Sequence, residues 1–268
     1  MHDLFTVESF DLEKTYEYIL SIQVSLNGFS FSVSSSDKNE LVYYKNVPRK
    51  ISNSALLKRH LNEWFQNEEL VKKPFRKINI IVFSEIFSLI PEQYYNTSAK
   101  SLLPLILFDN KKKFEIAENS IHHIPAKLMF ALPPGINKTF QNYFEEYEII
   151  HPIKLVMNNL TESTANSLVL LFDAQYFYAI LYNQNRVMNI NSFELAHVND
   201  VVYFCLTMLN QSGISSKQTT LYISDIRNDS LEMKENLNKY FTEIVPLDIN
   251  TEISGVQQKI HFTHLCGH

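Results

Sequence analysis

Residues 168–193 read LVLLFDAQYFYAILYNQNRVMNINSF. Apolar side chains run through most of this stretch, and short polar breaks divide it into three segments. Such a pattern predicts three strands joined by tight turns. The strands are expected at 168–173, 175–182 and 186–193.

Helices and strands alternate after this meander. Apolar residues recur at helical spacing within 197–211, which predicts a helix there. Residues 219–224 (TTLYIS) are expected to form a buried strand, 229–241 another helix and 243–248 another strand.

The same order occurs in the first half of the chain. Strands are expected at 18–25, 29–33 and 41–47, and the Asn27-Gly28 pair is a strong hairpin signal. Asn53 is expected to cap a helix that runs to about Leu70, followed by a buried strand at 77–83 (KINIIVF) and a helix at 98–108. Equivalent points lie about 148 residues apart at the first hairpin (27 against 175) and about 141 apart at the buried strand (78 against 219).

This repeat predicts an α/β protein with two similar lobes, each a mixed sheet flanked by helices. A single irregular mixed sheet is the alternative. The first lobe is expected at 1–164 and the second at 165–268. Between the two copies, residues 126–160 predict a small strand-helix-strand subdomain. Because this segment lies between the copies, we expect it to be unnecessary for either sheet and to offer a contact surface.

The duplicated order resembles the actin-like ATPase architecture, which belongs to the ribonuclease H-like folds. The stretches that carry the resemblance are LSIQVSLNGFSFSV (20–33), KINIIVFSEIFSLIPEQYY (77–95) and the 168–193 stretch with the helix after it. The chain is similar to an uncharacterised family of Bacteroidetes proteins with this fold, a domain of unknown function. The segment 126–160 is similar to a subdomain of actin-like cell-division and type IV pilus assembly proteins. In those proteins this subdomain contacts neighbouring proteins, so the resemblance implies a contact surface in this segment.

The chain departs from active relatives at the turns where they hold phosphate, magnesium and adenosine. In those relatives, each lobe's first hairpin carries an aspartate with nearby glycine. Here the first turn, at 24–28 (VSLNG), has no acid, and the second, at 172–176 (FDAQY), has Asp173 but no glycine. The adenosine turn is expected at 224–228 (SDIRN), also without glycine. Asp173 is therefore a weak candidate magnesium contact, and the other reading is a turn residue that bonds its own backbone.

Composition excludes several classes of enzyme. The chain has five glycines in 268 residues, no two of them close together, so neither G-x-G-x-x-G nor the Walker motif is present. A Walker ATPase, a dinucleotide enzyme and a protein kinase are therefore largely excluded. The net charge of −5 does not suggest a nucleic-acid partner. The 14 tyrosines can serve either as half-buried sheet residues or as an interface.

The two cysteines form no disulfide framework, which favours a reducing cytoplasm. The N-terminal residues do not read as a signal peptide, and no stretch is long and apolar enough to insert into a membrane. The C-terminal stretch carries four weak candidate metal ligands, although their spacing matches no usual zinc template. They are His261, His264, Cys266 and His268.

The expected function is non-catalytic and works through contacts with an unknown protein partner, in a process that the sequence does not name. No cofactor is expected, and no catalytic residue can be assigned. The first alternative is a degenerate ATPase or phosphotransferase of the same superfamily. The second is a metal-binding protein that uses the C-terminal histidines and cysteine.

Overall fold

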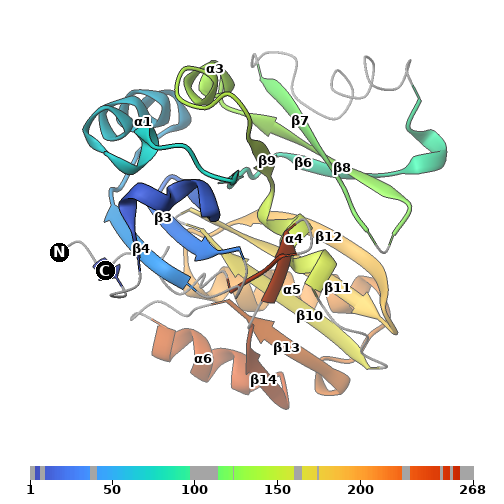
Figure 1. The fold of residues 1–268 in the computed structure, drawn as a ribbon. Coiled ribbons are helices and arrows are strands. Elements are labelled where there is room, and N and C mark those ends of the chain that lie inside the picture. The colour runs from blue at the N-terminus through green and yellow to red at the C-terminus, as the bar shows by residue number, and fades with distance from the viewer. Residues whose placement is uncertain are drawn as a thin grey trace. The chain divides into compact units, whose positions relative to one another are not determined.

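The fold is taken from a computed structural model (Figure 1). It describes residues 4–6, 10–36, 41–96, 114–122, 124–159, 165–173, 175–224, 230–247, 250–253 and 256–259. These residues divide into two compact units. The first contains the described residues up to Asn159 together with those from Asn250 to Lys259, and the second contains the rest.

The first unit is built on a six-stranded sheet in the order β1-β4-β3-β2-β5-β9. Strands β2, β3 and β4 form an antiparallel meander, whereas β5 pairs parallel to β2 and β9 pairs parallel to β5. Strand β1 pairs antiparallel to β4 at the edge. The bounds are β1 Leu4–Thr6, β2 Tyr18–Ser25, β3 Gly28–Ser35, β4 Leu41–Pro48, β5 Lys77–Val82 and β9 Glu148–Ile150.

Helix α1 (Ser54–Asn67) packs on the apolar face of this sheet. It begins where Asn53 accepts a hydrogen bond from the Leu56 N–H, as the sequence predicted. The core beneath it includes Ile22 and Phe31 from the strands and Leu61 and Phe65 from the helix. Three short 3-10 helices complete this region, η1 (Leu12–Glu17), η2 (Leu70–Lys72) and η3 (Glu92–Tyr94).

A three-stranded antiparallel sheet, β6-β8-β7, also belongs to the first unit. Its strands are β6 (Phe87–Pro91), β7 (Glu115–Ser120) and β8 (Ala126–Leu132). Helices α3 (Ile136–Gln141) and α4 (Pro152–Asn159) come after β8, and the antiparallel pair β15 (Asn250–Ile253) and β16 (Val256–Lys259) returns to this unit from the end of the chain.

The structure corrects what we expected of residues 126–160. Strand β8 pairs with β6 and β7, which lie before this segment in the sequence, so the small sheet extends well beyond it. Strand β9 instead pairs with β5 and completes the six-stranded sheet. The segment is therefore needed by two sheets, contrary to the expectation that neither would need it. The helix of this segment, α3, covers only Ile136–Gln141.

The second unit contains a five-stranded sheet in the order β12-β11-β10-β13-β14. Strands β10, β11 and β12 form the antiparallel meander, and β13 and β14 extend it in parallel. Helices α5 (Val198–Gln211) and α6 (Ser230–Asn238) pack on each other and contribute to the apolar core. The bounds are β10 Asn166–Phe172, β11 Tyr176–Asn183, β12 Arg186–Glu194, β13 Thr219–Ile223 and β14 Glu243–Pro246, with η4 at Ser216–Gln218.

The two sheets share one topology. The order β4-β3-β2-β5-β9 in the first unit matches β12-β11-β10-β13-β14 in the second, and the pairing directions agree strand by strand. The expectation of two lobes with mixed sheets is confirmed, and the alternative of one irregular sheet is wrong. The helix expected at 98–108 lies outside the described residues.

Candidate functional site

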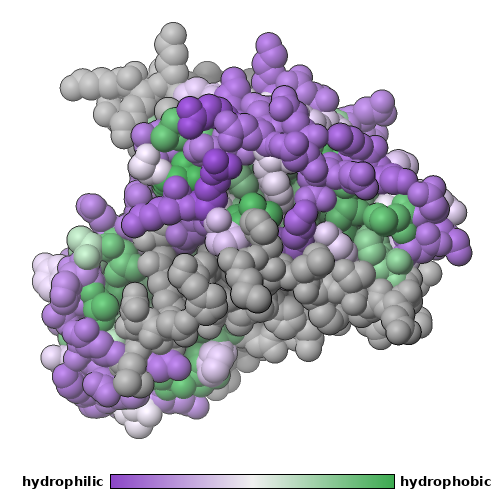
Figure 2. Space-filling model, turned by 90° about the vertical axis from the view of Figure 1, so that its left-hand side faces the viewer, coloured by the Kyte–Doolittle hydropathy of each residue, from purple (hydrophilic) through white to green (hydrophobic). Residues whose placement is uncertain are grey.

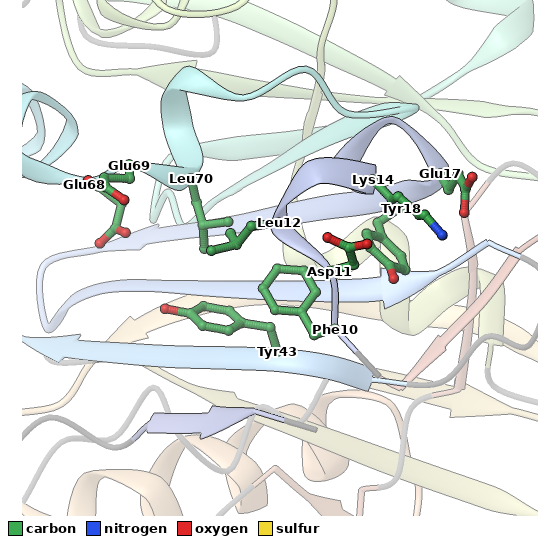
Figure 3. Close-up of a pocket in the computed structure, with 10 residues that line it drawn as sticks. All are labelled: Phe10, Asp11, Leu12, Lys14, Glu17, Tyr18, Tyr43, Glu68, Glu69 and Leu70. Atoms are coloured by element: carbon green, nitrogen blue, oxygen red, sulfur yellow. The ribbon is translucent and has the colours of Figure 1, made fainter. Parts of the chain in front are cut away.

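A hollow of about 800 Å³ lies on the first unit, over the face of the sheet that α1 also covers (Figure 3). We call it the η1 pocket. The helix η1 and the two residues before it, Phe10 and Asp11, form one side, and the segment from Glu68 to Leu70, after α1, forms the other. Strands β2 and β4 contribute Tyr18 and Tyr43 between them. The pocket therefore occupies the space that two separate elements leave over one sheet face.

Three aromatic rings line the η1 pocket. Phe10 packs at 5.2 Å from Tyr43 and at 5.6 Å from Tyr18, measured between ring centroids. Tyr18 and Tyr43 point to the same side because both lie in register with the strand residues that face α1. Tilted rings at these distances stabilise one another by more than the burial of their apolar area alone would give. They therefore form a defined apolar wall of the pocket.

Carboxylates lie at both ends of the pocket. Figure 3 shows Glu68 and Glu69 at one end and Lys14 and Glu17 at the other, with Phe10, Leu12, Leu70 and Tyr43 between them. Glu68 is 7% exposed and accepts a hydrogen bond from the Lys45 ammonium at 2.6 Å. Burial and the Glu68 charge raise the pKa of Tyr43 to about 12. Its hydroxyl therefore stays protonated at neutral pH.

A second, smaller hollow of about 420 Å³ lies further along β4. Phe29, Val47 and Arg49 line it from the sheet side, and Trp64 lines it from α1. The Trp64 indole stacks on Phe31 at 4.2 Å, and its buried N–H has no hydrogen-bond partner among the described residues. Lys45, with its partner Glu68, lies between Val47 and Tyr43 on this side of β4, so the ion pair separates the two hollows.

The first hairpin turn is closed by the chain itself. The Ser25 hydroxyl oxygen accepts a hydrogen bond from the Asn27 N–H at 3.0 Å. The Arg49 N–H donates to the Asn27 carbonyl and the Ile51 N–H to the Leu26 carbonyl, both at 2.8 Å. Gly28 has a φ of +129°, and a Cβ there would lie 2.4 Å from the Val47 carbonyl oxygen. Its missing side chain makes room for the neighbouring strand.

The second turn holds Asp173 in a buried position, 2% exposed. Its N–H donates to the Tyr176 carbonyl at 2.9 Å, and its carboxylate is hydrogen-bonded to the Tyr176 hydroxyl. Burial, followed by Tyr178 and Asp173, raises the pKa of Tyr176 well above its usual value. Asp173 therefore bonds within its own turn through its backbone, while its side chain holds a neighbouring tyrosine.

The remaining predicted site residues lie outside the described part of the chain. These are most of the adenosine turn and the C-terminal candidates His261, His264, Cys266 and His268. At the edge of that turn, the Ser224 hydroxyl accepts a hydrogen bond from the Phe172 N–H at 3.1 Å. Within the described ranges, no group of three or more histidine, cysteine or acidic residues could hold a metal ion.

The η1 pocket is the feature that sequence reasoning missed. Phe10 and Glu68 are separated by almost sixty residues, and neither stands in a recognisable motif. The available signal was the run of tyrosines in the strands, which allowed both a core and an interface. In the structure the exposure of these tyrosines differs. Tyr178 is fully buried, Tyr18 and Tyr43 are half-buried in the pocket, and Tyr16 and Tyr94 are exposed.

The comparisons with known proteins agree with this fold. A family model described as a protein of unknown function (DUF3822) matches residues 7–244. No curated protein matches the chain. A solved structure from Bacteroides thetaiotaomicron, a protein with actin-like ATPase fold and unknown function, is 17% identical, with 89% of this chain and 93% of that chain covered and a TM-score of 0.77. This likeness shows the actin-like ATPase fold.

Two further structures are more distant. The cytoplasmic domain of EpsL, an inner membrane component of the type II secretion system of Vibrio cholerae, is 10% identical, with 77% of this chain and 80% of that chain covered and a TM-score of 0.44. A chain of a PilM–PilN type IV pilus biogenesis complex is also 10% identical, with 86% of this chain and 88% of that chain covered and a TM-score of 0.46.

Proposed function

The chain belongs to the DUF3822 family of proteins of unknown function, and we propose that it works by contacting other proteins rather than by nucleotide chemistry. Proteins of one fold have many functions, so the fold does not decide between protein contacts and nucleotide chemistry. The choice is argued from the hairpin turns of this chain. The proposal places the protein in the cytoplasm. Among the described residues, no helix is long and apolar enough to cross a membrane.

One observation carries the proposal: the described groups of both hairpin turns bond or contact other parts of the chain itself. A phosphate-binding loop needs backbone N–H groups that point into free space, and glycines that let the anion approach them. In the first turn the Asn27 N–H is taken by Ser25, and the space beside Gly28 is taken by Val47 and Arg49. In the second turn the Asp173 N–H is taken by the Tyr176 carbonyl.

The exposed surface supports contact through polar groups and tyrosines. Among the coloured residues of Figure 2, hydrophilic ones predominate and hydrophobic ones lie in small patches. Large exposed apolar residues in the described ranges include four tyrosines: Tyr16, Tyr94, Tyr203 and Tyr240. Tyrosine is enriched in interfaces because it buries a ring and keeps a polar hydroxyl at its tip.

The alternative, a degenerate ATPase or phosphotransferase, rests on the acid Asp173 in the second turn. The metal-binding alternative rests on His261, His264, Cys266 and His268, and metal analysis of the purified protein tests it directly. Both remain proposals of lower rank, because neither has a described binding geometry behind it.

Partner capture tests the proposal. The α3 region presents Lys138 and Glu145 to solvent, whereas Ile136 and Phe140 face the core. We expect a protein partner to co-purify with the full chain from its native cells, and Lys138→Glu with Glu145→Lys to weaken that capture. The melting temperature should stay nearly unchanged, since exposed substitutions cost within about 0.5 kcal/mol. If the two substitutions left capture undiminished, the α3 region would be excluded as the contact surface. Repeated failure to capture any partner would count against the proposed function.

A further inference from the structure

The η1 pocket has a lining that selects for positive charge at its ends and apolar character in its middle. We infer that it receives an extended segment of a partner protein in which lysine or arginine residues flank an apolar side chain. This inference rests on the proposed function and names the chemistry of the partner.

The middle of the pocket is apolar and accessible. Leu12 is 44% exposed, and Figure 3 shows it beside Leu70 and above the ring of Phe10. An exposed leucine next to aromatic rings loses unfavourable contact with water when another apolar side chain covers it.

The ends of the pocket carry excess negative charge. Asp11, Glu17, Glu68 and Glu69 line it, against Lys14 in the lining and Lys45 at its border. Lys45 already pairs with Glu68. Glu17 and Glu69 are exposed, and neither makes an ion pair within the described part of the chain. A segment with basic side chains at both ends would supply the missing partners.

The aromatic wall favours the same ligand. Phe10, Tyr18 and Tyr43 are half-buried, so their ring faces are partly screened from water. A lysine ammonium or arginine guanidinium is attracted to the face of such a ring, most strongly where water is excluded. Anionic ligands, nucleic acid and anionic membranes would be repelled by the four carboxylates. The volume of about 800 Å³ accommodates several side chains of an extended segment.

The test uses labelled synthetic peptides in a Gly/Ser frame and fluorescence anisotropy with the full chain. We expect a Lys-Leu-Lys peptide to bind at least tenfold more tightly than Glu-Leu-Glu, and several-fold more tightly than Lys-Ser-Lys. Binding should weaken as salt rises, because exposed charges are screened. Amide chemical shifts should change at residues 10–18, 43 and 68–70.

Charge-reversed variants separate this pocket from general acidity. Glu17→Lys with Glu69→Lys should reduce binding of Lys-Leu-Lys at least tenfold. Glu232→Lys with Glu235→Lys, on exposed positions of α6, changes the net charge equally and should leave binding unchanged. Circular dichroism and melting curves establish that all variants are folded.

Several outcomes would overturn the inference: no measurable binding of Lys-Leu-Lys, equal binding of the acidic peptide, or equal loss in both pairs of variants. The proposed function fails separately. If a captured native partner still binds the Glu17→Lys, Glu69→Lys variant as well as wild type, the pocket inference fails while the function by protein contact stands. If the peptide binds as expected and no native partner is captured, the pocket chemistry stands and the proposed function fails.

Discussion

At the scale of single residues, His151 connects several elements of the first unit. Its side chain is fully buried beside the rings of Phe87 and Phe130. Its Nδ1 accepts a hydrogen bond from the Ile153 N–H at 3.2 Å, so the proton lies on Nε2, which donates to the Ser84 carbonyl at 3.0 Å. Its backbone N–H donates to Asn119 at 2.8 Å. The residue therefore links the start of α4 to the ends of β5 and β7.

His151→Ala should destabilise the first unit by about 2–4 kcal/mol, because it opens a cavity and removes the side-chain hydrogen bonds to the Ile153 N–H and the Ser84 carbonyl. His151→Asn should recover part of this loss, since asparagine can still accept from the first turn of α4. Urea unfolding followed by Trp64 fluorescence measures the free energy of unfolding of each variant, because Trp64 is the only tryptophan and lies in this unit. His122→Ala removes an exposed histidine and should cost less than about 0.5 kcal/mol. An equal, small effect for both histidines would contradict the role given to His151.

His151 also makes stability depend on pH. Burial lowers its pKa from 6.5 to about 3, against the opposing effect of the Ser84 hydrogen bond. The imidazole therefore binds a proton near pH 6.5 in the unfolded chain but only near pH 3 in the folded chain. Stability from this residue is complete above pH 6.5 and falls as the pH drops toward 3, by up to about 1.4 kcal/mol per pH unit. The slope of unfolding free energy between pH 6 and 4 should be smaller in His151→Asn than in wild type. Identical slopes would contradict it.

Sequence reasoning could not have assigned this role to His151. Its partners Ser84 and Asn119 lie 67 and 32 residues away, and no spacing rule joins them. Asp173 was visible as an acid in a turn, but its hydrogen bond to Tyr176 depends on the register of β10 with β11 and on its burial. Residues whose role is set by local geometry, such as the helix cap Asn53, were predictable.

At the scale of elements, the burial of strand β2 differs from what its sequence pattern indicates. Strand β2 was expected from its alternating apolar and polar residues, a pattern typical of a strand with one solvated face. The structure instead buries both faces: Ser21 and Gln23 on one face are 0% and 3% exposed, and Ile22 on the other is 0% exposed. Alternation therefore identified the strand correctly but did not reveal its environment, which other parts of the fold determine.

Gly28→Ala should cost at least about 2–3 kcal/mol, because the new Cβ meets backbone atoms at 2.4 and 2.6 Å and the φ of +129° is strained for alanine. Gly213→Ala is the matched control. Its φ is +67°, but nothing lies within 4 Å of the added Cβ, so only backbone strain of about 1 kcal/mol is expected. Thermal melting of both variants measures the difference. A smaller loss for Gly28→Ala than for Gly213→Ala would show that the hairpin is not held as described.

At the scale of the whole molecule, the sequence showed most of the repeat, but β9, the counterpart of β14, was assigned to the segment between the two copies. The order of elements at a nearly constant offset predicted the shared topology of the two sheets, because local patterns specify strands and helices and chain order restricts how they connect. The return of β15 and β16 to the first unit was not predictable, since it depends on which surface the end of the chain finds. The η1 pocket was hidden for the same reason: it exists only where η1 and the segment after α1 come together over the sheet.

Thermal melting with millimolar ATP and magnesium decides between the proposed function through protein contacts and nucleotide chemistry. A ligand at a hundred times its dissociation constant stabilises a fold by about 2.7 kcal/mol, which is a melting shift of about 5–10 °C for a chain of this size. We expect a shift below about 1 °C, since the described groups of both turns bond or contact other parts of the chain. A reproducible, magnesium-dependent shift of several degrees that disappears in Asp173→Asn would contradict this expectation and identify a degenerate ATPase.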